Sequence, residues 1–182
     1  MKRRNFLKSV ASAVPLTLAE PFASALQPTT PSQTHLVHAH DDWFSETHSP
    51  GYTEILFKTS PAHTPSVFAI EHTAIQPGWG PPLHLHLAQD EWFYVLQGKV
   101  LAQVGDQRVT LGPGDSILGP RNIPHAFVAL GPNPAHMLIT FTPAGRMEQF
   151  FRDTVAVGPQ QAAAVFSRYG MKLVGPRLSP TA

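Results

Sequence analysis

Short apolar runs, separated at close intervals by turns that contain Gly or Pro, dominate the chain from Tyr52 to Thr142. β-Branched and aromatic residues are frequent in these runs, which predicts strands. The expected strands are Tyr52–Thr59, Ser66–Ile75, Leu83–Leu87, Glu91–Leu96, Lys99–Val104, Arg108–Leu111, Asp115–Leu118, His125–Leu130 and Ala135–Thr142. Many short, evenly spaced strands favour an all-β fold, either a closed barrel or two packed sheets. With 19 Pro and 13 Gly among 182 residues, a helical bundle is excluded.

The pattern changes after Pro143. Residues 145–154 and 159–169 are predicted to form two short helices, the second starting near Pro159 and ending at Gly170 in a C-cap position. A last extended segment is expected at Met171–Val174. We therefore predict one domain, with a β-barrel over residues 52–143 and C-terminal helices and a tail over residues 144–182.

The N-terminus has the features of an export signal. Lys2, Arg3 and Arg4 precede an apolar run, Val10–Leu18, and Ala23-Ser24-Ala25 follows as a small-x-small cleavage site. We predict a twin-arginine-type signal peptide over residues 1–25, although Lys2 stands where that motif prefers Ser or Thr. The apolar run is too short to span a bilayer, so no stable membrane anchor is expected after cleavage. The alternative is that this segment is not cleaved and remains as a membrane anchor.

Residues 26–51 contain several Pro residues and show no sustained period, so they are predicted to be a linker or an N-terminal arm. An exported protein would be periplasmic or secreted. The formal charge of +1 offers no basis for nucleic-acid binding, and a small-molecule substrate is the expected partner.

A candidate metal site lies between Gly78 and Gly98. His84 and His86 are two apart on a predicted strand, so their side chains share a face, and Glu91 opens the next strand. His125 follows a second Gly- and Pro-punctuated turn and is the natural fourth ligand. The chain has no Cys, so any metal must be held by nitrogen and oxygen. Three imidazoles and one carboxylate suit a divalent transition metal.

Alternation along the neighbouring strands predicts what surrounds these ligands. Phe93 and Val95 share the face of Glu91, and Phe127 shares the face of His125, so all three are predicted to line an apolar pocket. The alternative for the four polar residues is a cluster that holds no metal.

These residues resemble the two motifs of the cupin family. Gly78, His84, His86, Glu91 and Gly98 match the first motif at every position. The second motif is matched by Gly114, Asp115, Pro120 and His125, with departures at Asn122, where Gly is usual, and at Ala129, where Asn is frequent. The similarity covers about residues 52–182, and the segments after Phe141 resemble the tail of single-domain cupins related to quercetin 2,3-dioxygenases. A cupin double-stranded β-helix, or jelly-roll barrel, is the fold that this resemblance implies.

The resemblance also implies a function: a metal-dependent dioxygenase acting on a phenolic or enediol molecule. One ion of Fe, Mn, Ni or Cu, with Zn less favoured, would be held by His84, His86, Glu91 and His125, and Glu91 would also be the catalytic base. The alternatives are a non-redox isomerase or lyase and a non-catalytic periplasmic binding protein. Small cupins commonly dimerise, so a homodimer is an expectation by analogy.

Overall fold

The computed structural model describes residues 34–154 and 162–181. The predicted signal peptide and the start of the second predicted helix at Pro159 lie outside these residues. Chain contacts separate residues 1–34 from residues 35–182, and all the secondary structure given below belongs to the second unit. No helix within the described residues is both long and apolar enough to cross a membrane.

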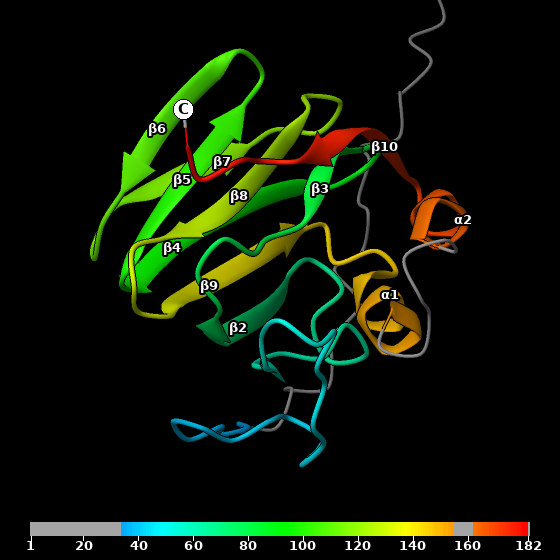
Figure 1. Cartoon of the computed structure of the whole chain (residues 1–182). Helices are drawn as coiled ribbons and strands as arrows, with labels where there is room; N and C mark the ends of the chain where they lie inside the picture. The colour runs from blue at the N-terminus through cyan, green and yellow to red at the C-terminus, as the bar shows by residue number, and fades with distance from the viewer. Residues whose placement is uncertain (1–33, 155–161, 182) are drawn as a thin grey trace, which may run out of the picture. The chain divides into compact units, whose positions relative to one another are not determined.

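Two five-stranded antiparallel sheets face each other (Figure 1). The first has the strand order β1-β2-β9-β4-β7 and the second has the order β10-β3-β8-β5-β6. The strands are β1 (Ile55–Phe57), β2 (Phe68–Ile75), β3 (Pro82–His86), β4 (Asp90–Gln97), β5 (Lys99–Val104), β6 (Gln107–Leu111), β7 (Ser116–Gly119), β8 (His125–Leu130), β9 (Ala135–Thr142) and β10 (Met171–Arg177). This is the jelly-roll architecture expected from the sequence.

The alternation of apolar and polar residues decides which side chains enter the sandwich. In β9 every second residue is buried from Ala135 to Phe141, and β4 alternates in the same way from Glu91 to Val95. The strand β8 is buried at five of its six positions, because neighbours cover both of its faces. The inward side chains form one large apolar core between the sheets.

Turn residues set the connections that the sequence predicted. The strands β5 and β6 form a hairpin in which Val104 lies opposite Gln107, so Gly105-Asp106 is its two-residue loop. Asn122, which replaces the usual Gly of the second cupin motif, has a φ of 63°. Asn tolerates this left-handed conformation better than most residues do, so the replacement preserves the turn that leads into β8.

The first predicted strand is the one that differs most from its expected length. Tyr52–Thr59 was expected to be extended throughout, but only Ile55–Phe57 pairs as a strand with β2. At one end the Thr59 hydroxyl, rather than a backbone carbonyl, accepts the hydrogen bond from the Ala69 N–H at 2.8 Å. A side chain that replaces a carbonyl in this way interrupts the ladder.

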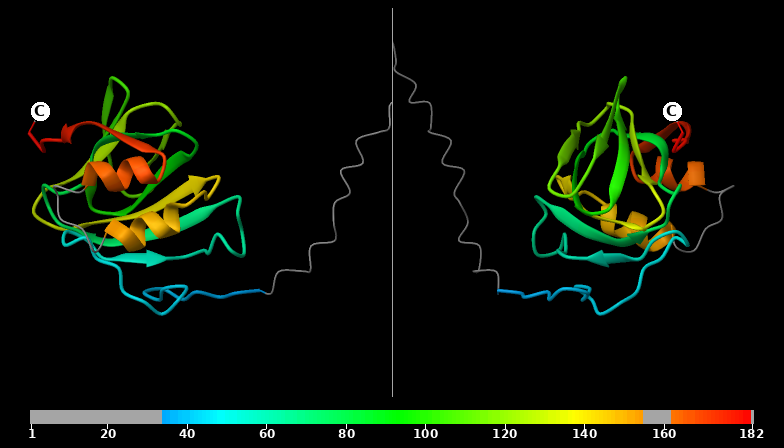
Figure 2. Two further views of the ribbon diagram at one scale, coloured as in Figure 1. Left: turned by 90° about the vertical axis from the view of Figure 1, so that its right-hand side faces the viewer. Right: turned by 60° about the vertical axis from the view of Figure 1, so that its left-hand side comes forward.

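Two short helices follow β9, α1 (Met147–Thr154) and α2 (Ala162–Arg168). Met147 and Phe150 of α1 and Val165 and Phe166 of α2 are buried and extend the core. The chain leaves α2 through Gly170, which has the positive φ expected of a glycine after a helix. Both helices lie at one side of the two sheets, with α2 beside β10 (Figure 2).

Candidate metal centre

Strands from both sheets bring His84, His86, Glu91 and His125 together. His84 and His86 come from β3 and His125 from β8, where it lies directly opposite His84. Glu91 comes from β4 in the facing sheet. One potential ligand atom of each side chain lies within 4.8 Å of those of the others, and all four residues are buried. The four predicted ligands therefore form one cluster that bridges the two sheets; their role as metal ligands stays a prediction.

Backbone carbonyls orient two of the imidazoles. The Nδ1–H of His84 donates to the carbonyl of Pro82, and the Nδ1–H of His125 donates to that of Ile123, both at 2.9 Å. In a neutral imidazole that keeps its single proton on Nδ1, Nε2 is the nitrogen that can bind a metal. The Nε2 atoms lie 3.7 Å (His84) and 2.9 Å (His125) from Oε2 of Glu91. Both Nε2 atoms therefore face the centre of the cluster, and that of His125 is hydrogen-bonded to the Glu91 carboxylate.

The hydrogen bonds among the described residues do not satisfy His86. Both of its ring nitrogens are buried and, among the described residues, neither has a hydrogen-bond partner. Its Nε2 lies 3.1 Å from Oε2 of Glu91 without forming a hydrogen bond. A buried polar atom without a partner is costly, and a cation between these atoms would satisfy it. The donor set thus fits a divalent transition metal.

Charge in the cluster is concentrated on Glu91. Burial alone would raise the pKa of Glu91, but the imidazoles of His125, His84 and His86 outweigh burial and hold this pKa well below its usual value. Burial lowers the pKa of His84, whereas the contact with Glu91 outweighs burial and raises the pKa of His125. Near neutral pH the cluster therefore offers an ionised carboxylate and a neutral His84, the forms in which these groups bind metals.

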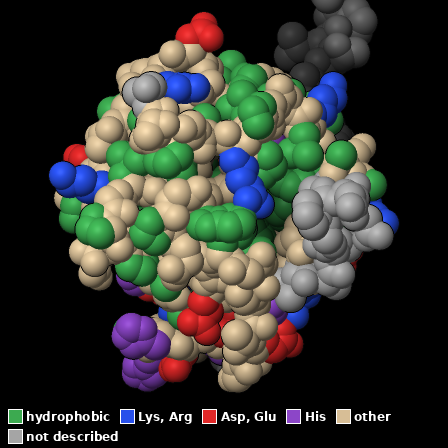
Figure 3. All heavy atoms as spheres, in the orientation of Figure 1, with side chains coloured by type: hydrophobic (Ala, Val, Ile, Leu, Met, Phe, Trp, Pro, Cys, Tyr) green, Lys and Arg blue, Asp and Glu red, His purple; other side chains and the backbone are tan. Residues whose placement is uncertain are grey.

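The cluster opens into a cavity of about 630 Å³ between the sheets and the helices. Aromatic and aliphatic side chains form most of its wall, and Phe127 is one of them. On the face shown in Figure 3, basic side chains near the middle are bordered by hydrophobic ones. A cavity of this size and lining suits a small, largely apolar organic molecule.

Phe93 and Val95 do not belong to the wall of this cavity. Both are buried in the core, and the Phe93 ring packs against those of His125 and Phe127 at centroid distances of 5.8 and 5.9 Å. They do share the face of Glu91, but each second residue along a strand lies about 7 Å further on. That displacement carries them beyond Glu91 into the core, where Phe93 packs against the His125 ring.

Four polar residues of the wall were not among the predicted site residues: Tyr52, His72, Thr154 and Arg177. His72 alternates with the buried Phe68 and Ile70 on β2, so its strand register was a usable signal for an inward position. Arg177 lies beyond the predicted end of the last extended segment, because β10 continues through Pro176 at the edge of its sheet. Tyr52 precedes the short β1.

Comparison with known proteins agrees with this architecture. Residues 71–141 match the family model described as a cupin domain. This part of the chain is therefore similar to a cupin domain. The match contains three of the candidate ligands from the first motif and the fourth from the second. A search of curated proteins finds no significant match to the chain.

Solved structures share this fold at low sequence identity. KdgF from a Halomonas species is 22% identical with a TM-score of 0.52, covering 60% of this chain and 94% of its own. An RmlC-like cupin from Shewanella frigidimarina is 20% identical with a TM-score of 0.52, covering 61% and 92%. A Streptomyces PAC13 variant with uridine is 14% identical with a TM-score of 0.53, covering 80% and 93%. These similarities establish the fold and leave the reaction open.

Proposed function

We propose that this protein is an exported metal-dependent dioxygenase that acts on a phenolic or enediol small molecule, in the manner of the quercetinase-like cupins. A buried set of three His and one Glu that opens into a largely apolar cavity carries this proposal. Fe, Mn, Ni or Cu would be held by His84, His86, Glu91 and His125. The bound ion would supply Lewis-acid and redox chemistry.

The residues of the chain would bind, orient and deprotonate the substrate. Glu91 is ionised across the neutral range, so its carboxylate can accept the proton of a substrate hydroxyl. Phe127 and its apolar neighbours in the wall would hold the flat part of the substrate and exclude water. Both atoms of O2 would enter the substrate as one carbon–carbon bond breaks, so that no external reductant is needed.

Location and assembly are also proposals. The basic residues, apolar run and small-x-small site at the N-terminus support export to the periplasm or the medium. A homodimer is proposed only by analogy with other small cupins. Neither affects the chemistry above.

The first experiment is the metal content of the purified protein, measured by elemental mass spectrometry without chelator. We expect near-stoichiometric Fe, Mn, Ni or Cu, lost in a double variant His84→Ala/His86→Ala and retained in His63→Ala, an exposed histidine outside the cavity. Oxygen uptake with a panel of phenols and enediols, by the wild type and the same variants, then tests the reaction. A metal-free wild type, or no oxygen uptake with any compound, would contradict the proposal.

The second candidate is a non-redox isomerase or lyase. Tyr52, His72 and Arg177 favour it, because they place more polar groups around the cavity than an apolar pocket requires. Turnover of a sugar acid or keto acid without oxygen would support this candidate over the dioxygenase. A binding protein would show neither activity.

A further inference from the structure

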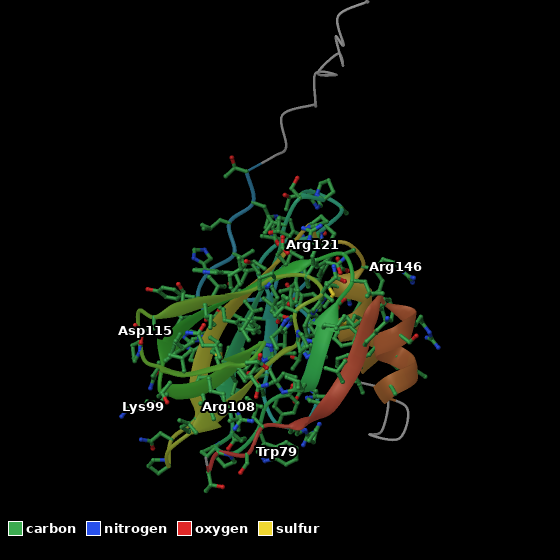
Figure 4. The ribbon with its side chains drawn as sticks, turned by 90° about the horizontal axis from the view of Figure 1, so that it is seen from above. Trp79, Lys99, Arg108, Asp115, Arg121 and Arg146 are labelled. Carbon is green, nitrogen blue, oxygen red and sulfur yellow. The ribbon has the colours of Figure 1, made fainter. Side chains whose placement is uncertain are left out.

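Three flat side chains are stacked at one end of the cavity: Tyr52, Trp79 and Arg177. The rings of Tyr52 and Trp79 are nearly parallel, with an interplanar angle of 8° and centroids 5.9 Å apart. The guanidinium of Arg177 lies 4.5 Å from the centre of the Trp79 ring and 6.0 Å from that of Tyr52. Trp79, labelled in Figure 4, lies near the carboxyl-terminal end of β10. Cation–π attraction therefore holds the Arg177 side chain against this group of rings.

The charge of Arg177 is not neutralised by a carboxylate within the part of the chain that the structure describes. Arg121, Arg152 and Arg168 each form an ion pair with an Asp or a Glu, but no carboxylate of residues 34–154 or 162–181 lies within 4.0 Å of Arg177. Arg146 is comparable, since its guanidinium lies 4.7 Å from the centre of the Tyr169 ring and it has no such ion pair either. Of these two, only Arg177 lines the cavity.

Strand register places Arg177 close to the candidate metal ligands. Arg177 on β10 lies opposite Pro82 on β3, and Leu173 lies opposite His84. Pro82 and His84 are two residues apart, so the backbone position of Arg177 is displaced by about 7 Å along β3 from that of His84. Residues two apart also share a face of the strand. Arg177, His84, His86 and Glu91 all line the cavity, so one molecule bound there could contact both the guanidinium and the cluster.

The charges of Arg177 and Glu91 both affect Tyr52. Burial raises the pKa of Tyr52 to about 12; Arg177 opposes this shift and Glu91 adds to it. The hydroxyl therefore stays protonated at neutral pH and is available as a hydrogen-bond donor to a ligand.

The charges of the cavity favour an anionic ligand. A divalent ion held by three imidazoles and one carboxylate would have a net charge of about +1 together with its ligands, and Arg177, which lines the same cavity, adds another. Uncompensated charge is unfavourable beside an apolar wall. A substrate that brings a carboxylate and a deprotonated hydroxyl would balance both charges.

We propose that Arg177 binds a carboxylate of the substrate at this end of the cavity, so that the protein selects phenolic carboxylic acids over neutral phenols. The choice of the phenolic class rests on the proposed function. A guanidinium can bind a carboxylate through two parallel hydrogen bonds, which also fixes the direction in which the ring enters. The hydroxyls at the other end of the ring then point toward Glu91.

The test is equilibrium binding to the metal-loaded protein without oxygen, by calorimetry, with 3,4-dihydroxybenzoate and its methyl ester as probes. We expect the wild type to bind the acid at least about tenfold more tightly than the ester. Arg177→Gln should remove this preference, and Arg177→Lys should keep part of it. Arg146→Gln is the matched control, because it removes an equally unpaired cation outside the cavity, and it should keep the full preference.

Equal binding of acid and ester by the wild type, or binding of neither, would overturn the proposal. So would an Arg177→Gln variant that still prefers the acid. The reaction itself is tested separately: absence of oxygen uptake together with an Arg177-dependent preference for the acid would contradict the dioxygenase while supporting the carboxylate site.

Discussion

Gly119 illustrates how one residue without a side chain makes room for a candidate ligand. It lies at the end of β7, opposite Glu91 in the sheet. A Cβ atom at this position would lie 2.9 Å from Nδ1 and 3.0 Å from Cγ of the His125 ring. These distances are shorter than ordinary contacts, so a side chain here would have to move the imidazole.

We predict that Gly119→Ala weakens metal binding. The displaced His125 ring would lose the alignment of its Nε2 with Glu91, and changes of this kind cost about tenfold or more in metal affinity. Metal content after dialysis against a weak chelator measures the loss. The control is Gly112→Ala, whose Cβ would meet only the Asp115 carboxylate at 3.7 Å. Equal metal retention by both variants would show that His125 tolerates the added methyl group.

His72 is a buried histidine in the wall of the cavity, and its Nδ1 has no hydrogen-bond partner among the described residues. Burial lowers its pKa to about 4; Glu91 opposes the shift and His136 adds to it. The folded protein thus keeps His72 neutral, while the unfolded chain takes up a proton below pH 6.5. The titration of His72 therefore lowers the free energy of unfolding of the protein as the pH falls from 6.5 toward 4.

We predict that His72→Phe makes the protein less sensitive to acid. Between pH 7 and pH 4 the free energy of unfolding of the wild type should fall by about 3 kcal/mol more than that of the variant, which has no titrating group at this position. Urea denaturation at several pH values measures the difference. Parallel pH curves for the two proteins would mean that His72 is protonated in the folded state as readily as in the unfolded chain.

At the scale of strands and helices, much could be predicted because local patterns carry the information. Period-two alternation located the strands and put Glu91 on an inward face, and the Gly and Pro turns marked their ends. Strand pairing does not follow from alternation. The turn before His125 and the second cupin motif indicated His125 as the fourth ligand, but neither predicted that it lies opposite His84. The cavity depends on where α1, α2 and the end of β10 pack, and no local period encodes this; hence Arg177 was not among the predicted site residues.

An ion-pair network joins the three strands at one edge of the first sheet. Glu71 on β2 contacts Lys58, just after β1, at 2.8 Å and His136 on β9 at 2.6 Å. Burial would raise the pKa of Glu71, but the hydrogen bonds and charges of Lys58 and His136 outweigh it and lower the pKa below 4.5. A carboxyl group whose pKa is lower in the folded protein than in the unfolded chain stabilises the fold at pH values above the unfolded pKa. This contribution is lost as the pH falls through the folded pKa.

We predict that Glu71→Gln lowers the free energy of unfolding at pH 7 by about 1 kcal/mol, the upper end for a partly exposed pair. The deficit should shrink as the pH falls below 4.5, where the wild-type carboxylate also becomes protonated. Thermal unfolding of both proteins at pH 7 and pH 3.5 measures it. A deficit that is equal at both pH values would indicate lost packing in place of lost charge.

At the scale of the whole described unit, the segment before β1 covers an edge that the sheet would otherwise expose. The Ile55 N–H donates to the His48 carbonyl, and the Trp43 N–H donates to the Phe57 carbonyl, both at 2.8 Å. The His48 ring also stacks on that of Phe57 at a centroid distance of 4.0 Å. A dimer formed through the outer edge of β1 would have to displace these contacts first. The sequence showed only a Pro-containing arm here, because its contacts are made to residues far along the chain.

Asp42 is the residue that fastens this arm. Its buried carboxylate accepts hydrogen bonds from the backbone N–H groups of Phe44 at 2.8 Å, Glu46 at 3.2 Å and Phe57 at 2.6 Å. We predict that Asp42→Ala lowers the free energy of unfolding by about 3 kcal/mol, since it leaves the buried Phe57 N–H without a partner. Asp42→Asn, which keeps one acceptor oxygen, should cost less.

The same variant tests what the arm protects. An uncovered edge strand offers unpaired N–H and C=O groups to a second chain, so Asp42→Ala should also associate more readily than the wild type. Light scattering after size-exclusion chromatography, at matched protein concentrations, measures this association. An Asp42→Ala protein that is destabilised but has the wild-type mass would show that the arm stabilises the fold without guarding the edge. Increased mass in Asp42→Ala, and not in Asp42→Asn, would tie the exposed edge to the loss of the carboxylate.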